Sequence, residues 1–79
     1  MRELIKEKVY GFLKKELNTP PHKFGEDKLL YDDLLMDDID VLELAVYIED
    51  EFDIKIPDDE WVSNWKTVKD VVDYIVGRI

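Results

Sequence analysis

The side chains of this chain that could do chemistry are mostly carboxylates, and they are concentrated in its middle. Asp37, Asp38 and Asp40 lie close together, and no Lys or Arg occurs between residues 32 and 53. Grouped carboxylates can transfer protons or hold a divalent cation. A calcium-binding loop, however, needs alternating oxygen ligands followed by glycine, whereas Leu42 follows here and no glycine is near. Paired-carboxylate hydrolysis needs a cleft, which so small a chain scarcely offers. We therefore expect neither catalysis nor a specific metal site.

Other residues with catalytic or ligand-binding potential are few. His22 is the only histidine, lies next to two prolines and has no nucleophile beside it. Ser63 is the only serine and is predicted to lie in a short helix. Cysteine is absent, so neither a disulfide nor a cysteine-based zinc site is possible. Trp61 and Trp65, one turn apart on the same predicted short helix, are expected to pack over the end of the fold rather than to stack on a ligand.

Three longer helices and one short helix are predicted to position these residues. The first ends before Asn18-Thr19-Pro20-Pro21, because proline cannot continue a helix. Its apolar stripe comprises Leu4, Ile5, Val9, Phe12, Leu13 and Leu17. Gly11 lies inside this helix at a cost in stability that the sequence does not explain. A connection over residues 18–37 follows, predicted to pack its own apolar side chains and to form a helical turn near Leu30–Leu34. Those side chains are Phe24, Leu29, Leu30, Leu34 and Leu35.

The second long helix is predicted from Asp38 to Phe52. Its buried face comprises Val41, Leu44, Ala45, Ile48 and Phe52, and its opposite face Asp40, Glu43, Tyr47, Asp50 and Glu51. An extended segment with Ile54 and Ile56 directed inward leads to a short helix that starts near Pro57. Thr67 is predicted to cap the last helix. The stripe of that helix comprises Val68, Val71, Val72, Ile75 and Ile79. The fold class is therefore all-α, a four-helix bundle in a single domain over residues 1–79.

The charge distribution restricts the kind of partner. The net charge is −9. Residues 1–23 contain six bases and three acids, whereas residues 24–79 contain five bases and seventeen acids. Such a field repels nucleic acid and anionic lipid and attracts basic protein surfaces. The charged N-terminus lacks the apolar run of a signal peptide, and no stretch is long and apolar enough to span a membrane. We expect a soluble, cytoplasmic monomer with no nucleic-acid partner.

The chain resembles acyl carrier proteins over nearly its whole length, most strongly from Leu35 to Ile56 and over residues 67–75. That family opens its second helix with Asp-Ser-Leu, and the serine hydroxyl is esterified by 4'-phosphopantetheine. The matching triplet here is Asp37-Asp38-Ile39. The resemblance implies a carrier-type four-helix bundle that is not an enzyme and that acts in fatty acid or polyketide-type metabolism. Because Asp38 has no hydroxyl to esterify, we expect no cofactor at the position that matches the attachment site.

Three interpretations of Asp38 remain open. Its carboxylate can cap the helix, although Asp37 or Asp40 could serve instead, and Asp40 and Glu43 have the spacing of a capping box. It can also stand in for the anionic phosphodiester and so keep partner surfaces engaged. Alternatively, it can be an engineered replacement of the serine.

The acidic surface of the second helix is the predicted partner-binding site, called here the docking face. It comprises Asp40, Leu42, Glu43, Val46, Glu49, Asp50 and Asp58, with Asp37 beside it. An ordinary exposed helix gains stability from mixed-charge pairs, whereas this one accepts like-charge repulsion, which suggests that a partner supplies the bases. The resemblance implies synthases, ligases or transferases as partners. A solvated surface is the simpler interpretation, and a small acidic inhibitor that mimics nucleic acid is the alternative function.

Overall fold

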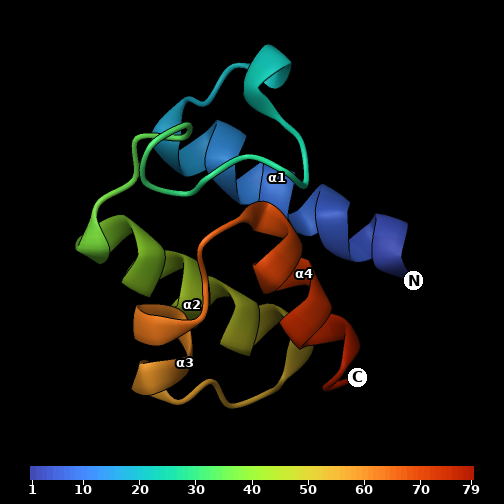
Figure 1. The fold of residues 1–79 in the computed structure, drawn as a ribbon. Coiled ribbons are helices and arrows are strands. Elements are labelled where there is room, and N and C mark those ends of the chain that lie inside the picture. The colour runs from blue at the N-terminus through green and yellow to red at the C-terminus, as the bar shows by residue number, and fades with distance from the viewer.

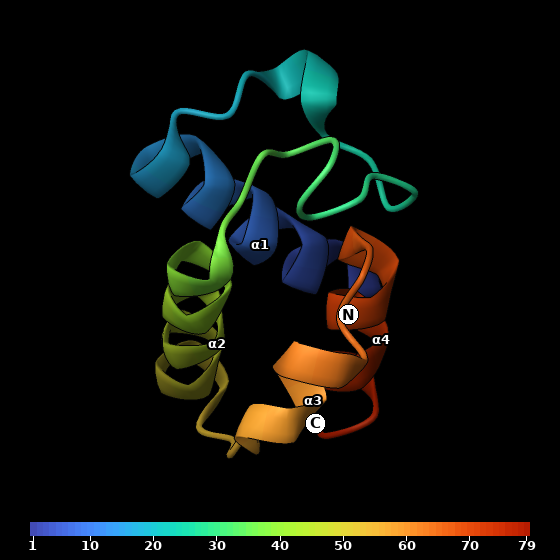
Figure 2. The same cartoon turned by 60° about the vertical axis from the view of Figure 1, so that its left-hand side comes forward.

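The computed structural model describes all residues, 1–79, and is helical throughout apart from its connections. The helices are α1 (Arg2–Leu17), the 3₁₀ turn η1 (Pro21–Lys23), α2 (Asp38–Phe52), α3 (Asp58–Ser63) and α4 (Val68–Val76). Helix α1 packs against both α2 and α4, and α3 lies beside α2 at the end of the bundle away from the long connection (Figures 1 and 2). The predicted all-α four-helix bundle is confirmed.

One continuous hydrophobic core holds the four helices together. Its buried residues come from every predicted stripe, with Ile5, Val9 and Leu13 from α1 and Leu44 and Ile48 from α2. The stripes are shorter than predicted at both ends of the chain, where Leu4 and Ile79 are about half exposed. Few residues pack around the ends of a chain, so an apolar side chain there remains exposed even when its spacing matches the apolar stripe.

The ends of the helices follow their local sequences. Asn18 ends α1 in the left-handed conformation that asparagine tolerates, as the predicted stop before the prolines requires. Asp53 ends α2 in the same conformation. Thr67 caps α4 as predicted, and its hydroxyl accepts a hydrogen bond from the Asp70 amide. Pro57 precedes the first residue of α3, which also agrees with the sequence.

The connection over residues 18–37 is ordered by hydrogen bonds to the segment that leads into α4. The amide of Leu30 donates to the Lys66 carbonyl at 2.9 Å, and the amide of Val68 donates to the Lys28 carbonyl at 3.1 Å. The single turn predicted near Leu30–Leu34 is present, because the Asp33 amide donates to the Leu29 carbonyl at 3.1 Å, four residues back as in a helix. It does not continue as a helix, and Leu29 also pairs with Thr67. A 3₁₀ turn that the sequence did not predict lies at Pro21–Lys23.

The apolar side chains of this connection divide between core and surface. Leu30 and Leu34 are buried and Phe24 packs against the core, as predicted. Leu29 and Leu35 are exposed, contrary to prediction, whereas Met36, which the sequence did not single out, is buried. Leu35 has a positive φ of 59°. Leu34 and Met36, on either side of this left-handed residue, are both buried, while the Leu35 side chain itself is 72% exposed.

Two aromatic residues also differ from prediction. Trp65 lies beyond the end of α3 and is buried in the core, while Trp61 is half-buried on the helix itself. Tyr47, predicted on the solvent face of α2, is half-buried, and its ring lies 5.3 Å from that of Phe12 on α1. A tyrosine ring can fill a helix interface while its hydroxyl stays near water, so an apparently polar position contributes to packing.

Candidate functional site

The start of α2 is fixed by a reciprocal pair of hydrogen bonds between Asp37 and Asp40. The Asp40 amide donates to Asp37 Oδ1 at 2.9 Å, and the Asp37 amide donates to Asp40 Oδ2 at 3.1 Å. Asp37 is therefore the N-cap, with the extended backbone that a cap requires. Of the three caps that the sequence left open, Asp37 is therefore confirmed, whereas a cap at Asp38 or Asp40 and a capping box between Asp40 and Glu43 are wrong. Asp38 is already helical, so its side chain cannot reach back over the first free amides.

Asp38 is the exposed first residue of α2 and has a different partner. Its Oδ1 accepts a hydrogen bond of 2.8 Å from the hydroxyl of Tyr31, which belongs to the connection before the helix. Burial, together with the hydrogen bond and the charge of Asp38, raises the pKa of Tyr31. The carboxylate also lies at the positive end of the helix dipole, where a negative charge is favourable. Local sequence does not indicate Tyr31 in this role, because the contact depends on the path of the connection.

The docking face is exposed at most of its predicted positions. Glu43, Asp50 and Asp58 are exposed, and Leu42 and Val46 leave 41% and 48% of their surface in water. Asp40 is half-buried, because its carboxylate takes part in the capping box. The face therefore combines free carboxylates with accessible apolar side chains.

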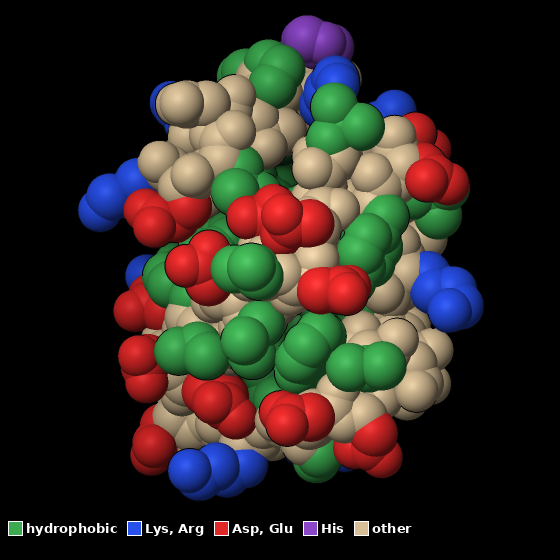
Figure 3. Space-filling model, turned by 90° about the vertical axis from the view of Figure 1, so that its left-hand side faces the viewer, with side chains coloured by type: hydrophobic (Ala, Val, Ile, Leu, Met, Phe, Trp, Pro, Cys, Tyr) green, Lys and Arg blue, Asp and Glu red, His purple; other side chains and the backbone are tan.

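Two further apolar side chains, on α2 and α3, are exposed. Ile39 of α2 and Val62 of α3 are 67% and 63% exposed. In the space-filling view, hydrophobic side chains gather over this side of the molecule and carboxylates border them (Figure 3). The sequence singled out Ile39 only as a neighbour of Asp38, and it did not single out Val62. An apolar patch rimmed by acids is a typical protein-binding surface.

Glu49 has a different role from the other predicted docking residues. It is half-buried, and its Oε2 accepts a hydrogen bond of 2.7 Å from the amide of Ile56. This bond ties the extended segment after α2 back onto the helix. Glu49 and Asp40 thus have local structural functions, and Glu43, Asp50 and Asp58 are the acids of the docking face that are free to meet a partner.

The remaining candidates are scattered. His22 is exposed in η1, and Ser63 is the exposed last residue of α3. No group of three or more His, Asp and Glu side chains is placed to hold a metal ion. Likewise, no helix has the length and apolar character needed to cross a membrane. The structure thus brings together only the residues around the start and outer surface of α2.

Cations gather at the other end of the molecule, near the N-terminus. Arg2 forms ion pairs with Glu26 and, at 2.7 Å, with Asp73, and Lys6 also pairs with Glu26. Arg2, assisted by Lys6, lowers the pKa of Glu26, and Lys69 and Arg2 lower the pKa of Asp73. These bases are engaged with acids outside α2, and of the α2 acids only Glu51 forms an ion pair, with Lys8.

Comparisons with known proteins agree on one family. Residues 7–75 match the family described as "Phosphopantetheine attachment site". An acyl carrier protein of Chlorobium phaeobacteroides is 36% identical over 74 residues, which cover 94% of each chain. One from Thermosynechococcus vestitus is 36% identical over 75 residues, covering 95% of this chain and 91% of its own length. One from Myxococcus xanthus is 49% identical over 51 residues, or 65% of this chain and 63% of its own.

Proposed function

Because the chain belongs to the acyl carrier protein family, we propose that it is a partner-binding module for enzymes that act on acyl chains. It is not an enzyme itself, in keeping with a family of carriers. The observation that carries the proposal is the outer surface of α2, where free acids surround exposed apolar side chains. A basic surface of a synthase, ligase or transferase would complement both features.

The prosthetic group of the family does not fit the start of α2 in this chain. The family arm is attached through a hydroxyl, and position 38 offers a carboxylate that already accepts a hydrogen bond from Tyr31. Ser63 is the only serine in the chain, and it lies at the far end of α3. We therefore infer that the chain acts without 4'-phosphopantetheine, whether Asp38 is native or replaces a serine.

Asp38 in this proposal serves as a fixed negative charge. The bond from Tyr31 holds its carboxylate at the exposed N-terminal end of α2, close to Asp37 and Asp40. A partner surface that binds a phosphodiester at this end of the helix in other carriers would contact the single Asp38 carboxylate here. The bond also connects the long connection to the helix, so it stabilises the surface that the partner contacts.

The experiment is a set of association rates on a partner recovered from the host with the immobilised protein. The charge reversals Glu43→Lys and Asp50→Lys together should slow association, and added salt should do the same, because exposed charges are screened beyond about 8 Å at physiological ionic strength. The matched control is Glu7→Lys with Asp27→Lys, which changes the net charge equally at two exposed acids outside the docking face.

The identity of the partner and its salt response decide the outcome. An enzyme of acyl-chain metabolism whose binding weakens with salt and with the docking-face reversals, but not with the control pair, supports the proposal. A basic nuclease as the recovered partner would favour the inhibitor function instead. Binding that ignores salt and both pairs of substitutions would show that the docking face is only a solvated surface.

A further inference from the structure

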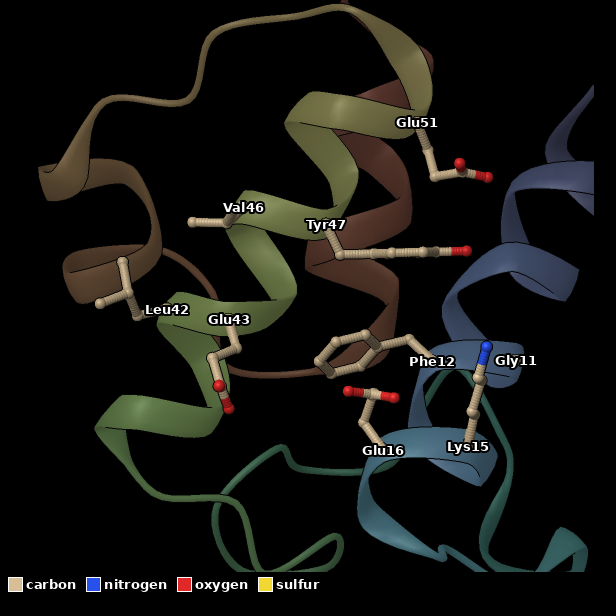
Figure 4. A pocket seen from close by; sticks show the side chains of 9 residues that line it. All are labelled: Gly11, Phe12, Lys15, Glu16, Leu42, Glu43, Val46, Tyr47 and Glu51. Carbon is tan, nitrogen blue, oxygen red and sulfur yellow. The ribbon is translucent and has the colours of Figure 1, made fainter.

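A second surface lies between α1 and α2. An open groove of about 770 Å³ runs between the two helices, and the aromatic rings of Phe12 and Tyr47 form its floor. The two rings project toward each other from the facing helices, and the side chains of Glu16 and Glu43 extend toward the gap from opposite sides (Figure 4). Leu42 and Val46 extend from α2 on the side away from α1, so the apolar surface continues from the groove onto the docking face.

Gly11 lies at the edge of this groove and has no structural reason to be glycine. It is an exposed residue within α1, its φ is not positive, and a Cβ atom built on it would meet nothing within 4 Å. Glycine within a helix costs stability relative to alanine. Gly11 therefore lowers the stability of α1 without allowing any closer contact within the fold. Glycine is useful where another molecule must approach the backbone closely, and the open space above Gly11 permits such an approach.

The charges around the groove favour a cationic occupant. Glu16 and Glu43 are exposed and form no ion pair. Glu51 is neutralised by Lys8 at 2.9 Å. Lys15 is the one remaining base on the rim. Two unpaired carboxylates on either side of an aromatic floor suit an arginine or lysine whose aliphatic stem lies on the rings.

We propose that this groove binds a basic amphipathic helix of a partner protein, with its apolar face on Phe12 and Tyr47 and its bases beside Glu16 and Glu43. In helix-in-groove recognition an amphipathic helix lays its apolar face in an apolar groove. This groove adds two acids on its rim and open space above Gly11. The inference rests on the proposed function only in taking the occupant to be a protein. Its site includes α1, which the docking face does not.

Other occupants suit the groove less well. A second copy of the chain would bring another net charge of −9 toward an acidic rim. An anionic amphiphile, such as a free fatty acid, would place its carboxylate beside Glu16 and Glu43. Like charges placed against each other disfavour such complexes, so the cationic helix is the occupant to which the structure points.

The test uses the full chain, isotopically labelled, and a synthetic peptide of leucine, lysine and arginine. The peptide has about 18 residues, long enough to form an amphipathic helix on binding. A counterpart with glutamate in place of every base serves as the control ligand. Nuclear magnetic resonance locates the contact through chemical-shift changes and through transfer of magnetisation between the leucine methyl groups and the rings of Phe12 and Tyr47. Titration with each variant gives the affinity.

Variants of the rim separate this groove from the docking face. Glu16→Lys should weaken binding of the basic peptide about tenfold, because it places like charges together. Glu7→Lys, an equal charge change at an unpaired acid of the same helix, should leave the affinity nearly unchanged. Lys15→Glu should tighten binding, because it removes the base that competes with the peptide.

A substitution at Gly11 should affect stability and binding in opposite directions. Gly11→Gln should raise Tm by about 2–6 °C, because glutamine is a better helix former, and should still weaken binding by obstructing the groove. Ring contacts, a loss with Glu16→Lys and this opposite response of Gly11→Gln would support the inference.

Several results would overturn it. These are equal binding of the acidic peptide, contacts confined to the start of α2 and to α3, self-association of the chain in place of peptide binding, or tighter binding by Gly11→Gln. Asp50→Lys can abolish binding of the partner recovered from the host while the groove variants affect neither that partner nor the peptide. In that case the inference that the groove binds a helix is wrong, and the proposed function stands. If neither the groove variants nor Asp50→Lys affect that partner, the proposed function fails as well.

Discussion

Replacing Asp37 by alanine should destabilise the protein more than replacing its neighbour Asp38. The Asp37 carboxylate accepts a hydrogen bond from the Asp40 amide, and the Asp37 amide donates a hydrogen bond to the Asp40 carboxylate. Asp37→Ala therefore breaks the first hydrogen bond and weakens the second. Loss of an N-cap costs about 0.5–2 kcal/mol, and loss of the reciprocal box places this variant in the upper half of that range, at about 1–2 kcal/mol.

Asp38→Ala should lower the free energy of unfolding less than Asp37→Ala does. It deletes one exposed hydrogen bond from Tyr31 and one carboxylate near the start of the helix, an effect of about 0.3–1 kcal/mol. Relief of repulsion from the neighbouring Asp37 and Asp40 offsets part of that loss. Asp37→Ser is the conservative variant, since serine caps nearly as well as aspartate, and it should lose only a few tenths of a kcal/mol.

The measurement is urea denaturation followed by circular dichroism, with thermal unfolding beside it. In a domain of this size, 1 kcal/mol corresponds to a change in Tm of roughly 4–8 °C, so the two alanine variants are separable. The slope of free energy against urea should stay constant, because neither change alters the surface exposed on unfolding. An Asp38→Ala variant that loses as much stability as Asp37→Ala, or more, would refute the assignment of the cap.

Two further predictions concern contacts that hold the fold. Glu49→Ala should lower the free energy of unfolding by about 1.5–3 kcal/mol, because it leaves the Ile56 amide without its charged acceptor. Glu49→Gln keeps an acceptor oxygen and should lower it less. Equal losses for the two variants in urea denaturation would contradict this role of Glu49. Arg2→Met should lower Tm more at pH 7 than at pH 3, because the folded protein lowers the pKa values of Glu26 and Asp73. The stability that these ion pairs contribute is fully present above the ordinary pKa values of 4.5 and 3.8, and it is lost as the pH falls from there through the lowered values of the folded state. An equal Tm difference at pH 7 and pH 3 would contradict this description of the ion pairs.

The sequence predicted the helices well because each signal was local. Proline and asparagine ended α1, Thr67 and Asp70 formed a capping box for α4, and the spacing of apolar residues gave α2 its bounds. The motif around Asp38 placed the chain in its family. These features depend on residues within a few positions of one another, and the conformation they favour is the one the fold retains.

The misassigned or missed features are those that depend on contacts between distant segments. Three aspartates within four positions can all cap a helix, and only the backbone conformation of Asp37 selects among them. The bond from Tyr31 to Asp38 requires the long connection to return to the start of α2. The bond from the Ile56 amide to Glu49 requires the chain to reverse at Asp53. None of these paths can be read from local spacing.

Position 38 has no hydroxyl to carry the prosthetic arm, and intact mass spectrometry is the decisive test for the loss of this attachment site. The protein is incubated with coenzyme A and a broad-specificity phosphopantetheinyl transferase, and Asp38→Ser is treated in parallel, with Ser63→Ala added to both to remove the only native serine. The mass of the protein with Asp38 should stay unchanged, and the Asp38→Ser variant should gain one phosphopantetheine if the surrounding surface remains that of a carrier. A phosphopantetheine adduct on the protein that retains Asp38 would show that the chain can carry the arm without a serine.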